Sequence, residues 1–324
     1  AEELLQEGQP DKDDKAEGVM SVWRKMRQVD DPEAFSSAWH AQRRQFINAF
    51  VDLDGDRQRD DDWRWNLTTK EDYGRWFAFG NGLDGQPSAA GEFTISTEGD
   101  RAVDRIFPSG VYTHTLSTKH RGFLASPRIE LRDEYQVWLR IAGGGKATVR
   151  YAVQNYPRSG SVYPFPEINK CKWFWQPLNL NYGSGDHVHF ELATARDAPL
   201  QVRNEDRSWF GIREAIVRKN GESPPMDNDS ELLEPLFGAA NDTSPSSLAE
   251  LAECYERAIA KAIAAWRDGD LNDRQALWLD GCLQEGILPN QLGDRPDLKS
   301  AVEEYRRLEA EIPLPTRVPG LVEA

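Results

Sequence analysis

The pattern of apolar residues predicts a long helix near the start of the chain. Aromatic residues recur there at helical spacing on roughly one face, namely Phe35, Trp39, Phe46 and Phe50. Asp31 is a suitable N-cap, and Pro32 fits the first helical turn because its missing N–H is not needed there. We expect this helix to end at the acidic segment 52–62, and the charged residues 1–15 to form a loosely held arm.

From Trp63 to Lys219 the pattern changes to that of strands. Short runs in which every second residue is apolar alternate with clusters of Gly, Pro, Asn and Asp. The alternating apolar residues are Val137, Leu139 and Ile141, then Val149, Tyr151 and Val153, then Val188, Phe190 and Leu192. Several such strands without helices between them predict an antiparallel β-sandwich rather than a parallel sheet.

Helical spacing returns after a segment rich in Pro, Ser, Asp and Asn. Ser247 and Glu250 fit an S-x-x-E capping box at the start of the next helix. Its predicted buried face comprises Leu248, Leu251, Tyr255, Ile259, Ile263 and Trp266. Two more helices are predicted, over 273–285 and 296–308. The last of them is expected to turn Leu298, Val302, Tyr305 and Leu308 inward.

These changes of pattern divide the chain into segments. The predicted segments are an N-terminal arm and helix (1–62), a sandwich (63–220), a linker (221–245), a helical segment (246–311) and a Pro-rich tail (312–324). The formal net charge is −15, which argues against nucleic acid as a partner because phosphate neutralisation needs a basic patch. No run of 18 apolar residues occurs, so we expect no membrane-spanning helix.

The three cysteines are widely separated in the sequence. Cys171, Cys254 and Cys282 lie in no C-x-x-C or C-x-x-C-H motif, so we expect no haem attachment and no zinc pair. Buried free thiols and a disulfide between Cys254 and Cys282 both fit this spacing.

Several phrases in the middle of the chain are distinctive. They read FPSGVYTHTLS (107–117), GFLASP (122–127), GGG (143–145), QNYPR (154–158), ELATA (191–195) and RSWFG (207–211). Together they resemble the central region of large secreted planctomycete proteins that also carry a cytochrome-c-like domain and conserved domains of unknown function. The resemblance implies a secreted, periplasmic or cell-surface location and neighbouring domains as partners. The haem-binding motif of that family is absent here, so no haem and no redox function is carried over.

Two of these phrases also resemble galactose-binding-like modules. In such modules an L-x-S-P phrase, here Leu124 to Pro127, precedes a strand, and a second strand ends in GGG, here Gly143 to Gly145. Glycines at a turn allow the positive φ that a tight connection needs. The resemblance implies a jelly-roll, galactose-binding-like β-sandwich of the carbohydrate-module type, flanked by N- and C-terminal α-helices. A phosphate loop is disfavoured because the G-x-x-x-x-G-K spacing is missing.

A stretch rich in aromatic and polar residues is the candidate ligand site. The residues assigned to ligand binding are Tyr156, Arg158, Tyr163, Trp173 and Trp175. Exposed Trp or Tyr rings stack on the apolar faces of sugars, while polar groups bind the hydroxyls. The alternative interpretation is that these aromatic side chains cover an edge or the floor of the sandwich. Trp209, at the start of the predicted last strand, is interpreted as a core residue rather than a site residue.

Acidic and histidine clusters give two candidate metal sites. Asp52, Asp54, Asp56 and Asp60 form a D-x-D-G-D-x-x-x-D segment, which suits Ca²⁺ if it curls as a loop, and otherwise is a solvated end of the helix. His187, His189 and Glu191 alternate on one face of a predicted strand, opposite the core row. Zinc needs a fourth ligand, and the sequence does not identify one.

The predicted function is that of a noncatalytic carbohydrate-binding-like module of a larger secreted protein, with glycan as its partner. Two alternatives stay open: a structural spacer that orients neighbouring domains, and a part of a glycoside-active enzyme. The chain has no G-x-S-x-G elbow and no cysteine in a recognisable nucleophile motif. A catalytic carboxylate pair is defined by its spatial separation, which a sequence does not give.

Overall fold

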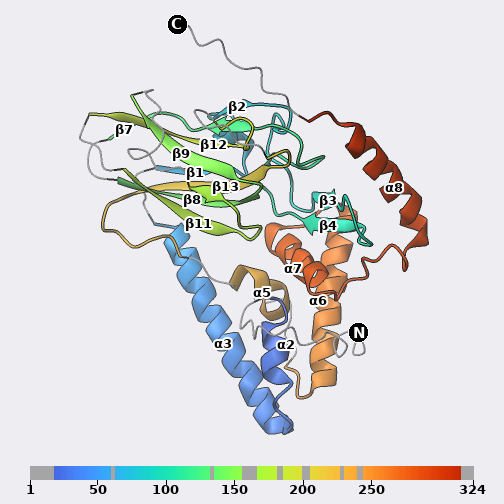
Figure 1. Ribbon diagram of the computed structural model, residues 1–324. Coiled ribbons are helices and arrows are strands. Elements are labelled where there is room, and N and C mark those ends of the chain that lie inside the picture. The colour runs from blue at the N-terminus through green and yellow to red at the C-terminus, as the bar shows by residue number, and fades with distance from the viewer. Residues whose placement is uncertain are drawn as a thin grey trace, which may run out of the picture. The chain divides into compact units, whose positions relative to one another are not determined.

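The computed structural model describes residues 18–59, 63–131, 135–154, 166–180, 185–198, 205–226, 230–238 and 244–314 (Figure 1). The chain divides into two compact units. The helical unit comprises Ala1–Arg59, Ala90–Pro108 and Met226–Glu303, and the sandwich unit comprises Asp60–Ala89, Ser109–Pro225 and Glu304–Ala324. The segment 90–108, which the sequence places in the sandwich, therefore belongs with the helices. None of the described helices combines the length and the apolar character needed to span a membrane.

Two antiparallel sheets form the sandwich unit (Figure 1). The first sheet has the order β1-β13-β8-β11, with β5 added to β13. Its strands are β1 (Trp63–Asn66), β5 (Val111–Tyr112), β8 (Tyr135–Gly144), β11 (Phe174–Leu180) and β13 (Trp209–Lys219). The second sheet has the order β10-β9-β12-β6-β2, with β7 added to β12. Its strands are β2 (Phe77–Phe79), β6 (Phe123–Ala125), β7 (Ile129–Glu130), β9 (Ala147–Val153), β10 (Glu167–Ile168) and β12 (His187–Ala193).

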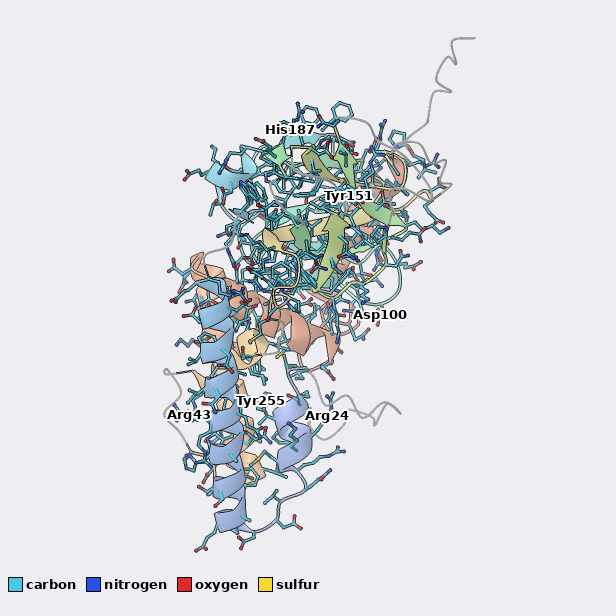
Figure 2. The ribbon with its side chains drawn as sticks, turned by 90° about the vertical axis from the view of Figure 1, so that its left-hand side faces the viewer. Arg24, Arg43, Asp100, Tyr151, His187 and Tyr255 are labelled. Atoms are coloured by element: carbon cyan, nitrogen blue, oxygen red, sulfur yellow. The ribbon has the colours of Figure 1, made fainter. Side chains whose placement is uncertain are left out.

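The predicted β-sandwich is thus confirmed, and the predicted alternating rows form its core. Leu139, Val149 and Phe190 are fully buried, and the other residues of those rows are buried with them. Figure 2 shows Tyr151 and His187 among the strands of this unit, one from the core row and one from the opposite row. The core is completed by aromatic residues from the first strand and the short helix α4 (Lys70–Tyr73).

The glycine-rich phrase forms the tight turn that the sequence predicts. Gly145 and Lys146 connect β8 to β9 with φ values of 63° and 57°. A Cβ atom at Gly145 would lie 1.9 Å from the carbonyl oxygen of Arg207, so only glycine fits there. Gly211 in β13 also lies close to a neighbouring side chain, because an added Cβ would lie 2.9 Å from the ring of Tyr112.

The helical unit contains most of the described helices and one hairpin. Its elements are α2 (Ser21–Met26), α3 (Pro32–Arg57), α5 (Ser230–Phe237), α6 (Leu248–Asp268), α7 (Asp273–Gln284), β3 (Phe93–Ile95) and β4 (Val103–Ile106). Asp31 caps α3 as predicted, since its carboxylate accepts a 2.8 Å hydrogen bond from the Ala34 N–H. Tyr255 lies among these helices (Figure 2) and packs against Trp278, while its hydroxyl donates to the Val19 carbonyl at 2.7 Å.

Helix α3 is longer than the sequence predicts. It continues through Asp52, Asp54 and Asp56 to Arg57, so the first part of the predicted acidic loop is helical. Contacts from distant parts of the helical unit hold its last turn. The Arg57 guanidinium donates to the Glu231 carboxylate at 2.7 Å, and the Asp56 carboxylate accepts a 2.9 Å bond from the Met226 N–H.

Three further predictions about helices need correction. The predicted linker contains α5, whose Leu236 and Phe237 are buried in the core of the helical unit. The predicted capping box is half formed, because Ser247 caps Glu250 but the Glu250 carboxylate accepts from Ser246 instead. On the predicted inward faces, Ile263 of α6 and Leu298 and Leu308 of α8 (Pro296–Glu311) are exposed, whereas Val302 is buried.

The C-terminal end of α8 is held within the sandwich unit by an ionic cluster, here called the Glu309 cluster. It consists of the buried residues Ser117, Lys119 and Glu309 and the more exposed Arg207. The Glu309 carboxylate accepts from Arg207 at 2.8 and 2.9 Å and from the Ser117 hydroxyl at 2.6 Å. The Lys119 ammonium lies 3.6 Å from the same carboxylate and donates to the Glu309 carbonyl at 2.7 Å. It therefore also caps the end of the helix.

Candidate functional site

The outer face of the second sheet, meaning the face that points away from the sandwich core, carries the candidate site. Cross-strand pairing places Phe77 of β2 opposite Ala125 of β6, and Phe79 opposite Phe123. The same row continues from Ala125 to Glu191 of β12 and on to Arg150 of β9. Because residues paired across antiparallel strands point to the same side, one face brings together an aromatic edge and a polar centre.

The aromatic edge, here called the aromatic strip, consists of Phe77, Phe79 and Phe123. The exposed fractions of Phe77 and Phe79 are 62% and 59%, and Phe123 is half-buried. The rings of Phe77 and Phe123 meet edge to face with centroids 6.4 Å apart. Large apolar side chains that remain this exposed, next to each other on a sheet edge, are a candidate interaction surface.

The neighbouring residues fix the direction in which the strip points. Tyr73 and Trp76, just before β2, are buried in the sandwich core, and the Tyr73 hydroxyl donates to the Asp84 carbonyl at 2.7 Å. Beyond β2, Gly80 has a φ of 111°, and an added Cβ would lie 2.4 Å from the Arg121 carbonyl oxygen. The short strand is thus anchored at both ends, which leaves its outward side chains, two residues apart, on one face.

The polar centre of the outer face is a buried, charge-compensated group. Arg150 forms an ion pair with Glu191, and His189 Nε2 lies 3.0 Å from Glu191 Oε1. Burial raises the pKa of the Glu191 carboxyl, but the hydrogen bond with His189 and the charge of Arg150 outweigh it and lower the pKa below the ordinary value. Glu191 is therefore ionised at neutral pH and is balanced by Arg150.

The predicted histidine row lies on the outer face, as its alternation indicates. His187 and His189 point away from the core row of Val188 and Phe190. The Glu191 carboxylate is engaged by Arg150. Among the described residues, no group of three or more His, Cys, Asp or Glu side chains is arranged to hold a metal ion.

The two described residues of the predicted ligand site lie on the other sheet. Trp173 packs against Tyr112 with ring centroids 5.9 Å apart, and the Arg213 guanidinium lies 5.8 Å from its ring. Trp175 is in β11, opposite Arg140, whose guanidinium lies 5.9 Å from the Trp175 ring. Both tryptophans are half-buried against these neighbours. The structure therefore separates them from the aromatic strip.

The other predicted ligand residues, Tyr156, Arg158 and Tyr163, lie outside the described residues. Trp209 is half-buried, so it is not one of the fully buried core residues, and its ring stacks on that of His114 with centroids 4.0 Å apart. Burial lowers the pKa of His114 to about 3, so this imidazole is neutral at physiological pH.

The aspartates of the predicted calcium segment lie on a helix instead of a loop. Asp52, Asp54 and Asp56 are two residues apart in α3, and side chains at that spacing do not face one another on a helix. The Asp54 carboxylate accepts from the Gln58 amide at 3.0 Å, and Asp56 is bonded within the helical unit. Asp60 lies outside the described residues. The three described aspartates therefore lack the loop geometry on which the calcium prediction depends.

Several of the solved structures to which the chain is similar are carbohydrate-binding modules. The chain is similar to TmCBM61 in complex with β-1,4-galactotriose, with 12% identity over 48% of this chain and 99% of that one and a TM-score of 0.29. It is also similar to a family 35 carbohydrate-binding module from Clostridium thermocellum, with 14% identity over 48% and 97% of the two chains and a TM-score of 0.29. A third is the carbohydrate-binding module CBM36 in complex with calcium and xylotriose, with 12% identity over 41% and 98% and a TM-score of 0.23. No protein-family model and no curated protein matches the chain.

The sequence pattern does not single out Phe77 and Phe79 as site residues. The signal was present as F-A-F, in which two aromatic residues alternate with a small one before a G-N-G turn. A strand of three residues is too short for its periodicity to indicate which row is exposed.

Proposed function

We propose that this chain is a noncatalytic carbohydrate-binding module and that the aromatic strip stacks on sugar rings. The observation that carries the proposal is the joint exposure of Phe77 and Phe79 on the outer face of a β-sandwich sheet. The C–H-rich face of a sugar is apolar, and an aromatic ring covers it while the hydroxyls stay in contact with water or polar groups.

The magnitude of such contacts suits a weak and specific binder. Fully burying a Phe side chain contributes about 1.5–3 kcal/mol relative to leaving it exposed. A sugar covers only one side of each ring, so each contact contributes roughly 1 kcal/mol. Two such contacts give a weak affinity for glycan. A module of this kind binds more tightly when it is repeated or joined to other binding domains, because linked sites raise the overall avidity.

The setting of the module is a second part of the proposal. The phrases from 107 to 211 that resemble secreted planctomycete proteins support a role in which this module docks a larger secreted, periplasmic or cell-surface protein to glycan. Calcium binding by Asp52, Asp54, Asp56 and Asp60 stays a prediction from the sequence, although the three aspartates in α3 lack the loop geometry that it assumed. Isothermal titration with Ca²⁺ that shows heat and a raised melting temperature would support it, and a titration without heat would exclude it.

The test is retention of the chain on immobilised glycans. A glycan array should identify neutral glycans that retain the wild-type chain, and the double variant Phe77→Ala/Phe79→Ala should lose that retention at an unchanged melting temperature. The matched control is Phe93→Ala, because Phe93 is also exposed, at 43%, but belongs to the helical unit.

The outcomes separate the competing functions. Loss of retention in the double variant alone supports the aromatic strip as the binding surface. Loss of glycan retention in Trp173→Ala or Trp175→Ala, with the double variant unaffected, would instead place the binding site in the aromatic stretch predicted from sequence. Retention on no glycan at all would contradict the proposal and favour a structural spacer.

A further inference from the structure

The two exposed rings of the aromatic strip stand on the same side of a single strand. Phe77 and Phe79 flank Ala78 in β2, and both pair with residues of β6 on the outer face. Since a strand rises about 3.3 Å per residue, their attachment points are roughly 7 Å apart along β2. A pyranose is a six-membered ring of about the size of one phenyl ring, so a single sugar covers one of them, and two sugars are needed to cover both.

The strip is also open along the strand. β2 is the edge strand of the second sheet, and all three of its residues are exposed. A ligand that lies on the strip is therefore not enclosed at either end by β2 itself. An open edge of this kind accommodates the interior of a chain, whereas recognition of a chain end needs a pocket that encloses it.

The charges near the strip are compensated. Arg121, just before β6, donates to the Asp197 carboxylate at 2.9 Å, and Arg75, just before β2, lies 3.6 Å from Asp72. Arg150, in the centre of the outer face, is balanced by Glu191. With a net charge of −15 on the whole chain, a polyanionic glycan would be repelled rather than attracted.

We propose that the aromatic strip binds an uncharged polysaccharide along β2, with sugar units stacked on Phe77 and on Phe79 at the same time. The inference rests on the proposed function and makes it narrower, since it names an internal stretch of a neutral chain as the ligand. Phe123 supports this arrangement, because its edge contact with Phe77 restricts that ring before the ligand arrives.

Chain-length dependence tests the inference. The probes are the monosaccharide, disaccharide, tetrasaccharide and hexasaccharide of β-1,4-linked glucose, xylose and galactose, titrated by calorimetry into the full chain. The affinity should rise steeply from the monosaccharide to the tetrasaccharide and change little beyond it. Phe77→Ala and Phe79→Ala should each lower the affinity for the hexasaccharide by about fivefold to tenfold, and Phe93→Ala should leave it unchanged.

Salt dependence tests the charge of the ligand. Binding of the neutral hexasaccharide should change by less than about twofold between roughly 50 mM and roughly 500 mM NaCl, because no charged contact is made. Pectate and alginate should not retain the chain at either salt concentration.

The results that overturn the inference differ from the result that overturns the proposed function. A monosaccharide that binds as tightly as the hexasaccharide would show a site for one sugar. Salt-sensitive retention on pectate or alginate would show an anionic ligand. Either result is compatible with carbohydrate binding but contradicts a neutral polysaccharide along β2. Absence of binding to every probe and every array glycan would contradict both the proposed function and this inference.

Discussion

Replacement of Glu309 by Gln tests how the C-terminal end of α8 is attached to the sandwich unit. The Glu309 side chain is only 4% exposed, and it receives the two Arg207 bonds and the Ser117 bond while Lys119 lies close by. The paired Arg207 hydrogen bonds outweigh burial, and with Ser117 and Lys119 they lower the pKa of Glu309 from 4.5 to about 2. A shift of that size corresponds to about 3 kcal/mol of stabilisation of the ionised form.

The expected loss in the variant is smaller than this figure. Arg207 is 44% exposed, so solvent screens part of its attraction for the carboxylate. Gln retains a carbonyl that accepts from Ser117, and Lys119 keeps its bonds to the helix carbonyls. We therefore expect Glu309→Gln to weaken the attachment by about 2 kcal/mol at neutral pH.

Hydrogen–deuterium exchange measures this attachment locally, which suits a chain with two units whose unfolding need not be two-state. Amides of residues 306–312 should exchange about thirtyfold faster in Glu309→Gln than in the wild type. A loss of about 2 kcal/mol raises the equilibrium constant for local opening of the helix end by that factor. The matched control is Glu304→Gln, because Glu304 pairs with Arg307 on the exposed side of the same helix. It should exchange like the wild type.

The sign of the pH dependence gives an independent check. A carboxyl whose pKa is lowered on folding contributes its full stability above its unfolded value near 4.5 and loses it as the pH falls toward about 2. The difference in denaturation midpoint between wild type and Glu309→Gln should therefore shrink progressively below about pH 4.5. Equal exchange in the two proteins at neutral pH, or a difference that does not depend on pH, would show that the charge of Glu309 does not hold the end of α8.

Three other predictions follow from local geometry. Gly145→Ala should lower the free energy of unfolding, measured by denaturant titration, by about 2 kcal/mol or more, because the positive φ and the Arg207 carbonyl both oppose a side chain. The control is Gly185→Ala, which also has a positive φ but has open space around it, and it should cost only about 1 kcal/mol. Asp31→Ala should cost about 1 kcal/mol through the lost N-cap of α3, and a change below about 0.3 kcal/mol would argue against that cap. In the native chain a thiol reagent should modify Cys171 and not Cys282, whose burial raises its pKa, and all three thiols should react after unfolding; one reactive thiol in the unfolded chain would instead indicate a disulfide.

Where residues alternate over long strands, the sequence was sufficient to predict the core. The rows around Leu139, Val149 and Phe190 each extend over several residues, so period two is unambiguous and burial follows from it. The same holds for the start of α3, because the cap of Asp31 involves only residues three positions apart. Local signals of this kind do not depend on the rest of the fold.

The sequence failed where distant contacts decide the outcome. The last turn of α3 is held by the bond from Arg57 to Glu231, which is 174 residues away in the sequence. The residues around the aspartates give no signal of this contact. Trp173 and Trp175 belong to the stretch predicted to bind ligand, but the pairing of β11 with β8 carries Trp175, and Trp173 just before it, to the first sheet. The exposure of Phe77 likewise depends on which edge of the second sheet β2 occupies, and only the topology determines that.

Binding of a neutral polysaccharide along β2 is tested most directly by a crystal structure of the full chain with a neutral β-1,4-linked hexasaccharide that it binds. We expect sugar rings stacked on Phe77 and on Phe79, with the polysaccharide running along β2 on the outer face. A hexasaccharide seated elsewhere, against Trp173 or in the loop that contains Tyr156, with both phenylalanine rings still exposed to solvent, would contradict it.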